Sequence, residues 1–160
     1  MAFNFSLVRV DEIVDQAVEA AVAYAANLGV EICRMRETRE FVINADPDRV
    51  NQAITNLISN AVKFSPSNSK VEVRTTRVGS GVRISISDQG AGIPEEFRAR
   101  IFQRFAQADS TDVRQKGGSG LGLSIVREIM ERHGGSVRFD SEIGRGTRFH
   151  LEFPANAEAA

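Results

Sequence analysis

The chain contains no tryptophan and a single cysteine among its 160 residues. One cysteine excludes an intramolecular disulfide and is typical of a reducing compartment. Because Cys33 lies in a strand-like run, we expect it to be a small buried core residue. Only two histidines are present, and no Cys/His cluster has the spacing of zinc ligands, so the sequence does not predict a zinc site.

Long apolar runs and an excess of one charge are also missing. No run approaches the roughly 20 apolar residues that span a bilayer, and the first residues do not resemble a secretory signal. Lys and Arg number 20 against 21 Asp and Glu, which gives no indication of nucleic acid or an anionic membrane as a partner. We therefore expect a cytoplasmic domain, and a membrane anchor elsewhere in the parent protein is compatible with this.

Helical and strand-like patterns alternate along the chain. Residues 1–154 form one expected domain and 155–160 a disordered tail or linker. Asp11 is the expected N-cap of a helix that Gly29 ends, and Asp46 opens a helix that ends near Ser65. A short helix is expected over 94–102 and a longer one over Leu121–His133. The strand-like runs are 3–10, 30–35, 40–45, 71–78, 82–87, 136–141 and 147–153. This order predicts an α/β sandwich, a mixed sheet with helices on one face and water on the other.

A polar stripe follows one face of the helix that begins after Asp46. Asn56, Asn60 and Lys63 fall at i, i+4 and i+7, beside an apolar stripe. Asparagine is a poor helix former, so its presence in mid-helix is either a solvated face or a row of amide oxygens for a hard cation such as Mg²⁺. Phe64 is then either a core residue or a wall for a base.

Two glycine-bearing loops are candidates for ligand contacts. In the first, Asp88 ends a strand and Gly90, Gly92 and Ile93 follow; the loop is either an ordinary Asp-x-Gly turn or a site where Asp88 accepts a hydrogen bond from an exocyclic amine.

The second loop leads into a helix through Gly118, Gly120, Leu121 and Gly122, which favours anion binding at the helix N-terminus. It is neither a Walker nor a Rossmann sequence. A third turn, Gly144-Arg145-Gly146, precedes Thr147 and is either a plain hairpin turn or part of the site.

In this order the segments resemble the catalytic ATP-binding domain of sensor histidine kinases, within the GHKL superfamily. Residues 56–65 resemble its asparagine box, 88–94 its first glycine box, 101–105 its phenylalanine box and 118–123 its second glycine box. The resemblance covers roughly Asp46 to Phe153. It implies the Bergerat-type fold, a two-layer α+β sandwich in which helices pack on a mixed sheet of about five strands.

The resemblance also implies a role for each matching residue. Asp88 would accept from the adenine amino group with help from Thr147, and Asn60, with Asn56, would hold Mg²⁺. Lys63 and Arg104 would act on the phosphates, so that Asn60, Lys63 and Arg104 form the catalytic set. Residues 109–119 would form a lid over the nucleotide. The remaining implied ATP contacts are Phe64, Gly90, Gly92, Ile93, Phe105, Gly118, Gly120, Leu121 and Gly122.

One position separates histidine kinases from the ATP-hydrolysing branches of the superfamily. Those branches (gyrase, the heat-shock chaperone and the mismatch-repair ATPase) carry a glutamate one helical turn before the metal asparagine, where this chain has Asn56. Because an amide is no general base at neutral pH, we expect phosphoryl transfer to a delivered nucleophile. Two alternatives stay open: a serine kinase of the anti-sigma type, and a nucleotide-binding pseudokinase that acts only as an interaction module.

The acceptor histidine of the family lies on a separate dimerising helical hairpin. His133 ends a helix, where a cation is favoured, and His150 lies in a strand, so we expect both to be structural. The implied partners are therefore the hairpin of the parent kinase and a response regulator, and the domain alone is expected to be monomeric.

Overall fold

A five-stranded mixed sheet forms the centre of the molecule in this computed structural model, which describes residues 2–103 and 120–154, the side chains of 120–122 excepted. The strand order is β2-β4-β5-β7-β6. Only β2 and β4 run parallel, and the other neighbours are antiparallel. The strands are β2 (Val30–Arg36), β4 (Ser69–Val78), β5 (Gly81–Ser87), β6 (Ser136–Glu142) and β7 (Gly146–Phe153).

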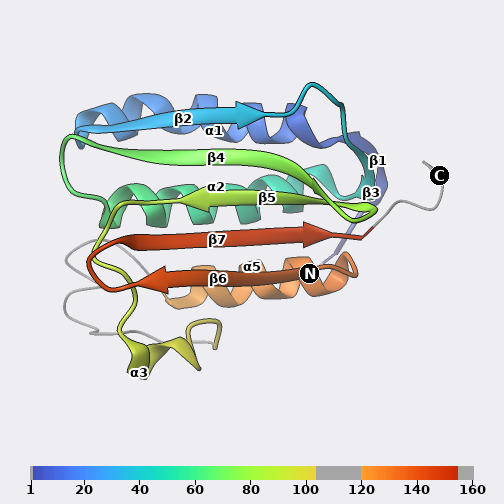
Figure 1. Cartoon of the computed structure of the whole chain (residues 1–160). Coiled ribbons are helices and arrows are strands. Elements are labelled where there is room, and N and C mark those ends of the chain that lie inside the picture. The colour runs from blue at the N-terminus through green and yellow to red at the C-terminus, as the bar shows by residue number, and fades with distance from the viewer. Residues whose placement is uncertain (1, 104–119, 155–160) are drawn as a thin grey trace.

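Three long helices cover one face of this sheet, and the other face is open (Figure 1). They are α1 (Val10–Asn27), α2 (Pro47–Phe64) and α5 (Gly120–Arg132), and the single turn α3 (Glu95–Arg98) lies at one end. On the covered face, strand residues such as Ile84, Ile86 and Leu151 are at most 1% exposed. The two-layer α+β architecture and the mixed sheet of five strands are confirmed. Within the described residues, no helix combines the length and apolar character needed to cross a bilayer.

Helix α2 is the central helix of the covering layer. Its buried residues are Val50, Ala53, Ile54, Leu57, Ile58, Ala61 and Val62. Burying each larger aliphatic side chain contributes about 1.5–3 kcal/mol, so this stripe fixes how the helix is rotated on the sheet. The polar residues between these positions must then point along the exposed flank of the helix.

Asp46 caps α2, as the sequence predicts, and joins it to two other segments. One carboxyl oxygen accepts from the backbone N–H groups of Asp48 and Arg49, at 3.0 and 3.1 Å. The other oxygen accepts from Asn4 N at 2.8 Å. The backbone N–H of Asp46 itself donates to Nε2 of His133, at the end of α5, at 3.1 Å.

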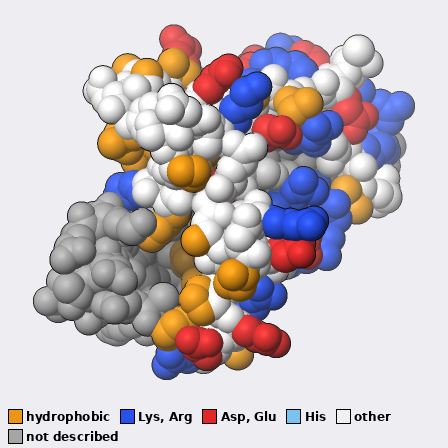
Figure 2. Space-filling view, turned by 60° about the vertical axis from the view of Figure 1, so that its left-hand side comes forward, with side chains coloured by type: hydrophobic (Ala, Val, Ile, Leu, Met, Phe, Trp, Pro, Cys, Tyr) orange, Lys and Arg blue, Asp and Glu red, His pale blue; other side chains and the backbone are white. Residues whose placement is uncertain are grey.

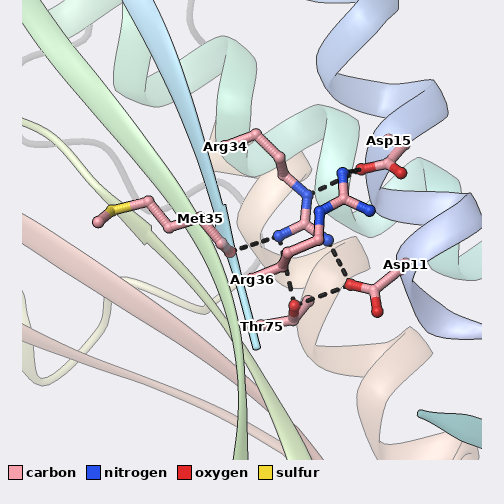
Figure 3. A network of polar contacts seen from close by, with 6 residues as sticks. All are labelled: Asp11, Asp15, Arg34, Met35, Arg36 and Thr75. Atoms are coloured by element: carbon pink, nitrogen blue, oxygen red, sulfur yellow. Dashed lines mark hydrogen bonds and ion pairs between the residues drawn. The ribbon is translucent and has the colours of Figure 1, made fainter. Parts of the chain in front are cut away.

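Asp11 is not the N-cap of α1, which begins one residue earlier, at Val10, after Arg9. Its carboxylate instead pairs with Arg34 of β2 and accepts from the Thr75 hydroxyl at 2.8 Å, as Figure 3 shows. Arg34 also binds Asp15, one helical turn further along α1, at 2.9 Å. This network fixes α1 against the sheet edge, and only 11% of the Arg34 side chain is exposed. Loss of the Asp11 carboxylate would therefore leave a partly buried charge with fewer partners, which costs more free energy than the loss of a surface ion pair.

Several expected boundaries and burials are wrong in detail. The first expected strand is shorter, β1 (Ser6–Arg9), and pairs with β3 (Val42–Ala45) in a separate antiparallel two-stranded sheet. The expected helix over 94–102 is helical only in α3. Cys33 is half-buried rather than a core residue, because the β2 register turns it to the open face of the sheet.

We expect Asp46→Ala to destabilise the domain by about 1 kcal/mol at neutral pH, because two N–H groups of α2 lose their cap. Burial alone raises the pKa of the Asp46 carboxyl, but three backbone N–H groups and the Arg49 charge outweigh it and lower the pKa below its usual 3.8. The cap therefore stabilises fully above pH 3.8 and loses this contribution as the pH falls through the lowered pKa.

Urea unfolding of wild type and Asp46→Ala at neutral and at acid pH checks this, with the exposed Asp48→Ala as the control. A deficit of the Asp46 variant that matches the control at neutral pH, or that grows on acidification, contradicts the cap.

Candidate functional site

Four segments far apart in the sequence meet at one end of the molecule. They are the C-terminal end of α2, the loop after β5, the β6–β7 turn and the first turn of α5, all at the left of Figure 1. Three of the four boxes found in the sequence have described residues in or beside these segments. The fold therefore brings the candidate residues of α2, of the first glycine loop and of the β6–β7 turn to one edge of the sheet.

Asp88 lies where β5 leaves the sheet, and its carboxyl group is held rigidly. Oδ1 accepts from the backbone N–H of Gly90 at 2.8 Å and from that of Thr147 at 3.2 Å. The Asp88 backbone N–H donates to the Thr147 carbonyl at 2.8 Å. Within the described part of the chain, Oδ2 has no hydrogen-bond partner. One carboxyl oxygen is thus fixed, and the other is available to a ligand.

The pKa of Asp88 is raised above its usual 3.8, because burial disfavours the charged carboxylate and the two N–H groups only partly offset this. A carboxylate held in such surroundings gains from a ligand that donates a hydrogen bond. Perturbed carboxyl groups of this kind are typical of functional sites.

The Thr147 side chain faces the same region, and its hydroxyl is joined to a residue that the sequence analysis missed. Thr147 is 6% exposed, and its Oγ1 lies 2.9 Å from Oγ of Ser141 in β6. Ser141 Oγ also accepts from Ile93 N at 2.7 Å. The signal available in the sequence was the β6–β7 hairpin, which places positions 141 and 147 opposite each other.

The glycines of the first loop are required by close contact with protein backbone. A Cβ atom at Gly90 would lie 2.5 Å from the Phe64 carbonyl oxygen, at the end of α2. Gly92 has a φ of +87°, and a Cβ there would lie 2.6 Å from the Glu142 carbonyl oxygen. Both are too short for any side chain, so the loop packs directly against α2 and against the β6–β7 turn. The sequence hypothesis of close approach to a ligand does not account for these contacts.

Asn56, Asn60 and Lys63 share a flank of α2, and all three are half-buried. The Asn60 side chain makes no hydrogen bond with the rest of the described chain, and Lys63 lies in the last turn, where its charge suits the helix dipole. Phe64 is 40% exposed, which excludes the core alternative, and its role as a wall for a base stays a prediction.

A cavity of about 280 Å³ opens beside Asp88 and Thr147. Figure 2 turns this end of the molecule forward and shows charged side chains of both signs crowded over the open sheet face to the right. The cavity lining combines both kinds of charge with hydroxyl groups: Ser87, Asp88, Asp140, Ser141, Glu142, Arg145, Gly146, Thr147 and Arg148.

Some expected site residues fall outside the described part of the chain. These are Arg104, Phe105, Gly118 and the proposed lid, residues 109–119. Gly120, Leu121 and Gly122 lie in the first turn of α5. The second glycine box therefore leads into a helix, as expected.

Both histidines are buried and engaged in the fold, as predicted. His133 accepts from Asp46 N through Nε2 and faces the Ile129 carbonyl through Nδ1 at 2.7 Å, which describes a neutral ring and not the expected cation. His150 lies 2.8 Å from the Ser85 hydroxyl through Nδ1 and 3.0 Å from Asp140 through Nε2. Burial lowers the pKa of His150, although the hydrogen bond to Asp140 opposes this.

Residues 45–157 match the family described as "Histidine kinase-, DNA gyrase B-, and HSP90-like ATPase". The chain belongs to this family. Asn56, Asn60, Asp88 and Thr147 all lie within the matched region, and the chain is an ATP-binding domain of the histidine-kinase type.

Several histidine kinases are similar to this chain in sequence. The chain is 36% identical over 98% of its length to the sensor-like histidine kinase SenX3 of Mycobacterium tuberculosis. It is 42% identical over 71% of its length to the circadian input-output histidine kinase CikA of Synechococcus elongatus. The chain spans only 38% and 15% of these relatives.

Solved structures agree with the fold at high coverage. ShkA, solved in complex with AMPPNP, superposes with a TM-score of 0.84 at 33% identity, over 98% of this chain and 32% of that one. The catalytic domain of the histidine kinase ThkA gives a TM-score of 0.84 at 26% identity, over 99% and 100%. These relatives favour the histidine-kinase branch over the anti-sigma and pseudokinase alternatives.

The β6–β7 turn of this kinase domain offers a matched pair of glycines. Gly146 has a φ of +108°, and a Cβ there would lie 2.1 Å from the Asp88 carbonyl oxygen. Gly144 has a φ of +83° and open space around it. We expect Gly146→Ala to displace Asp88 and to weaken ADP binding by about tenfold or more, whereas Gly144→Ala costs only about 1 kcal/mol of backbone strain.

Calorimetric titration with ADP and thermal unfolding of both variants check this prediction. Equal nucleotide affinities in the two variants would show that the turn does not position Asp88.

Proposed function

We propose that this domain binds Mg–ATP and donates the γ-phosphoryl group to a histidine on a separate dimerisation and phosphoacceptor domain of its parent protein. The observation that carries the proposal is the Asp88 carboxyl group, which is partly desolvated, fixed through Oδ1 and open through Oδ2. The adenine amino group is a hydrogen-bond donor, and it satisfies this oxygen without a second charge.

The polar flank of α2 suits the phosphates and their metal ion. Amide oxygens of Asn60 and Asn56 are one helical turn apart, and hard oxygen atoms are the ligands that Mg²⁺ prefers. The Asn60 amide, with no partner in the described chain, is suited to this role. When bound, Mg²⁺ neutralises phosphate charge and aligns the phosphates. Lys63 adds a positive charge on the same flank.

Asn56 decides between hydrolysis and transfer. An amide at this position cannot remove a proton from water, so water is a poor nucleophile in this site. An imidazole nitrogen delivered by the phosphoacceptor domain attacks the γ-phosphorus, the bond to the β–γ bridging oxygen breaks, and ADP leaves with those electrons. Positioning and charge stabilisation are most of what this transfer needs from a protein.

The acceptor, the response regulator and the place of action are part of the same proposal. A complex of ThkA with the response regulator TrrA is known, and we infer an analogous regulator for the parent of this chain. The domain supplies the bound nucleotide and the charged groups around its phosphates. It acts in the cytoplasm, where ATP is available, and it needs no dimer interface of its own.

Asp88→Asn tests the base site. Because Oδ1 accepts two N–H groups, the new amide keeps its oxygen there and turns its NH₂ toward the adenine amino group, donor against donor. We expect ADP affinity to fall at least about tenfold, or ~1.4 kcal/mol.

In the wild type, protonation of Asp88 removes the acceptor, so affinity is full above the raised pKa and falls as the pH drops through it. Calorimetry with ADP across pH measures both effects. Glu142→Gln, which changes another carboxyl group of the cavity, should bind and titrate like the wild type. Unchanged ADP affinity in Asp88→Asn would rule out this base site.

Asn60→Ala tests the proposed Mg²⁺ ligands on the polar flank of α2. We expect the Mg²⁺-dependent part of AMPPNP binding to disappear and transfer to an added phosphoacceptor domain to stop, because the amide ligand is lost. Asn51→Ala is the matched control, since nine residues along an α-helix place Asn51 on the opposite side of α2.

Titrations with and without Mg²⁺, and transfer assays with radiolabelled ATP, measure the outcome. A rapid intrinsic ATPase in the wild type, or Mg²⁺-dependent binding that survives in Asn60→Ala, would count against the proposed reaction.

A further inference from the structure

We propose that Ser141 is a positioning residue for base recognition. It orients the hydroxyl proton of Thr147 toward the nucleotide, and this orientation selects adenine over 6-oxopurines. The inference rests on the proposed placement of the base at Asp88, and it adds a residue that belongs to none of the sequence boxes.

The proton of the Ser141 hydroxyl has two possible acceptors. Thr147 Oγ1 lies 2.9 Å away, and the Gly146 carbonyl oxygen lies 3.4 Å away. The 2.9 Å contact allows either hydroxyl to donate. O–H···O hydrogen bonds in proteins are normally 2.5–3.0 Å long, so the contact with Gly146 is the weaker alternative, and the proposed orientation has Ser141 donating to Thr147. The Ser141 oxygen meanwhile accepts from Ile93 N at 2.7 Å, which holds the serine in place from the glycine loop.

Once Thr147 accepts from Ser141, its own proton must point elsewhere. Within the described chain Thr147 Oγ1 has no other partner, and the residue is only 6% exposed. A buried donor without an acceptor costs about 1–3 kcal/mol. An acceptor on the ligand, reached directly or through one water, removes this cost.

Asp88 and Thr147 then present an acceptor and a donor side by side. Adenine matches this pair, because its 6-amino group donates and its N1 accepts. Hypoxanthine and guanine present the reverse, since O6 accepts and N1–H donates. Sites that hydrogen-bond one pattern reject the reversed one strongly, because their buried groups are left unpaired. Ser141 contributes by keeping Thr147 in the donor orientation.

A simpler role for Ser141 is to hold the loop at Ile93 through the same hydrogen bond. That role predicts an equal loss of affinity for every nucleotide when the hydroxyl is removed. The orientation role predicts a loss that depends on the base. The two roles are therefore separated by comparing nucleotides and not by the size of one effect.

The experiment is calorimetric titration of wild type, Ser141→Ala and Ser141→Thr with ADP, inosine diphosphate and 1-deaza-ADP, which lacks the N1 acceptor. We expect Ser141→Ala to bind ADP about tenfold more weakly, the value of one good hydrogen bond, and to bind the other two nucleotides within about twofold of wild type. Ser141→Thr keeps a hydroxyl and should restore the adenine preference.

Ser87→Ala is the control, because Ser87 lines the same cavity but bonds Arg148, and it should leave all three affinities unchanged. Equal losses for the three nucleotides in Ser141→Ala, or no loss for ADP, would overturn the orientation role. Asp88→Ala with wild-type ADP affinity would instead overturn the proposed function itself.

Discussion

The site depends on backbone contact between segments that have no room for side chains. The Asp88 backbone packs directly on Gly146, and Gly90 packs on the Phe64 carbonyl at the end of α2. These contacts hold the end of β5, the β6–β7 turn and the C-terminus of α2 at fixed distances from one another. The proposed base-recognition residues lie on two of these segments and the proposed Mg²⁺ ligands on the third, so displacement of any one segment would separate the proposed base site from the phosphate site.

The buried stripe of α2 transmits this geometry to the rest of the domain. Its aliphatic residues fix the rotation of the helix on the sheet, and Asp46 ties the start of the helix to His133 at the far end of α5. Helix α2, which carries the proposed Mg²⁺ ligands Asn56 and Asn60, and helix α5, which follows the second glycine box, are therefore joined at the end of the domain away from the site. Rigid elements of this kind hold polar groups more exactly in place than loops do.

The sequence predicted what depends on periodicity and on glycine position. The apolar stripe of α2, the Asp46 cap, the end of α1 at Gly29 and the hairpins all follow from local rules. The N-cap role of Asp11 was wrong, because Arg34 of a distant strand pairs with its carboxylate. Ser141 was missed although the β6–β7 hairpin places it opposite Thr147, because its second partner, the Ile93 backbone, becomes a neighbour only when the glycine loop packs on the hairpin.

Glycine has a structural role at the candidate site of this family member. At Gly90, Gly92 and Gly146 it permits protein segments to touch, which is a requirement of the scaffold. In the proposed function, the choice between hydrolysis and transfer depends on a single side chain of α2, Asn56, which is not among the residues of those backbone contacts. On this proposal, the reaction type can change by a substitution on the polar flank of α2 while the backbone contacts of the site stay the same. The fold therefore indicates where the candidate site lies, whereas the residue at position 56 is needed to argue the reaction.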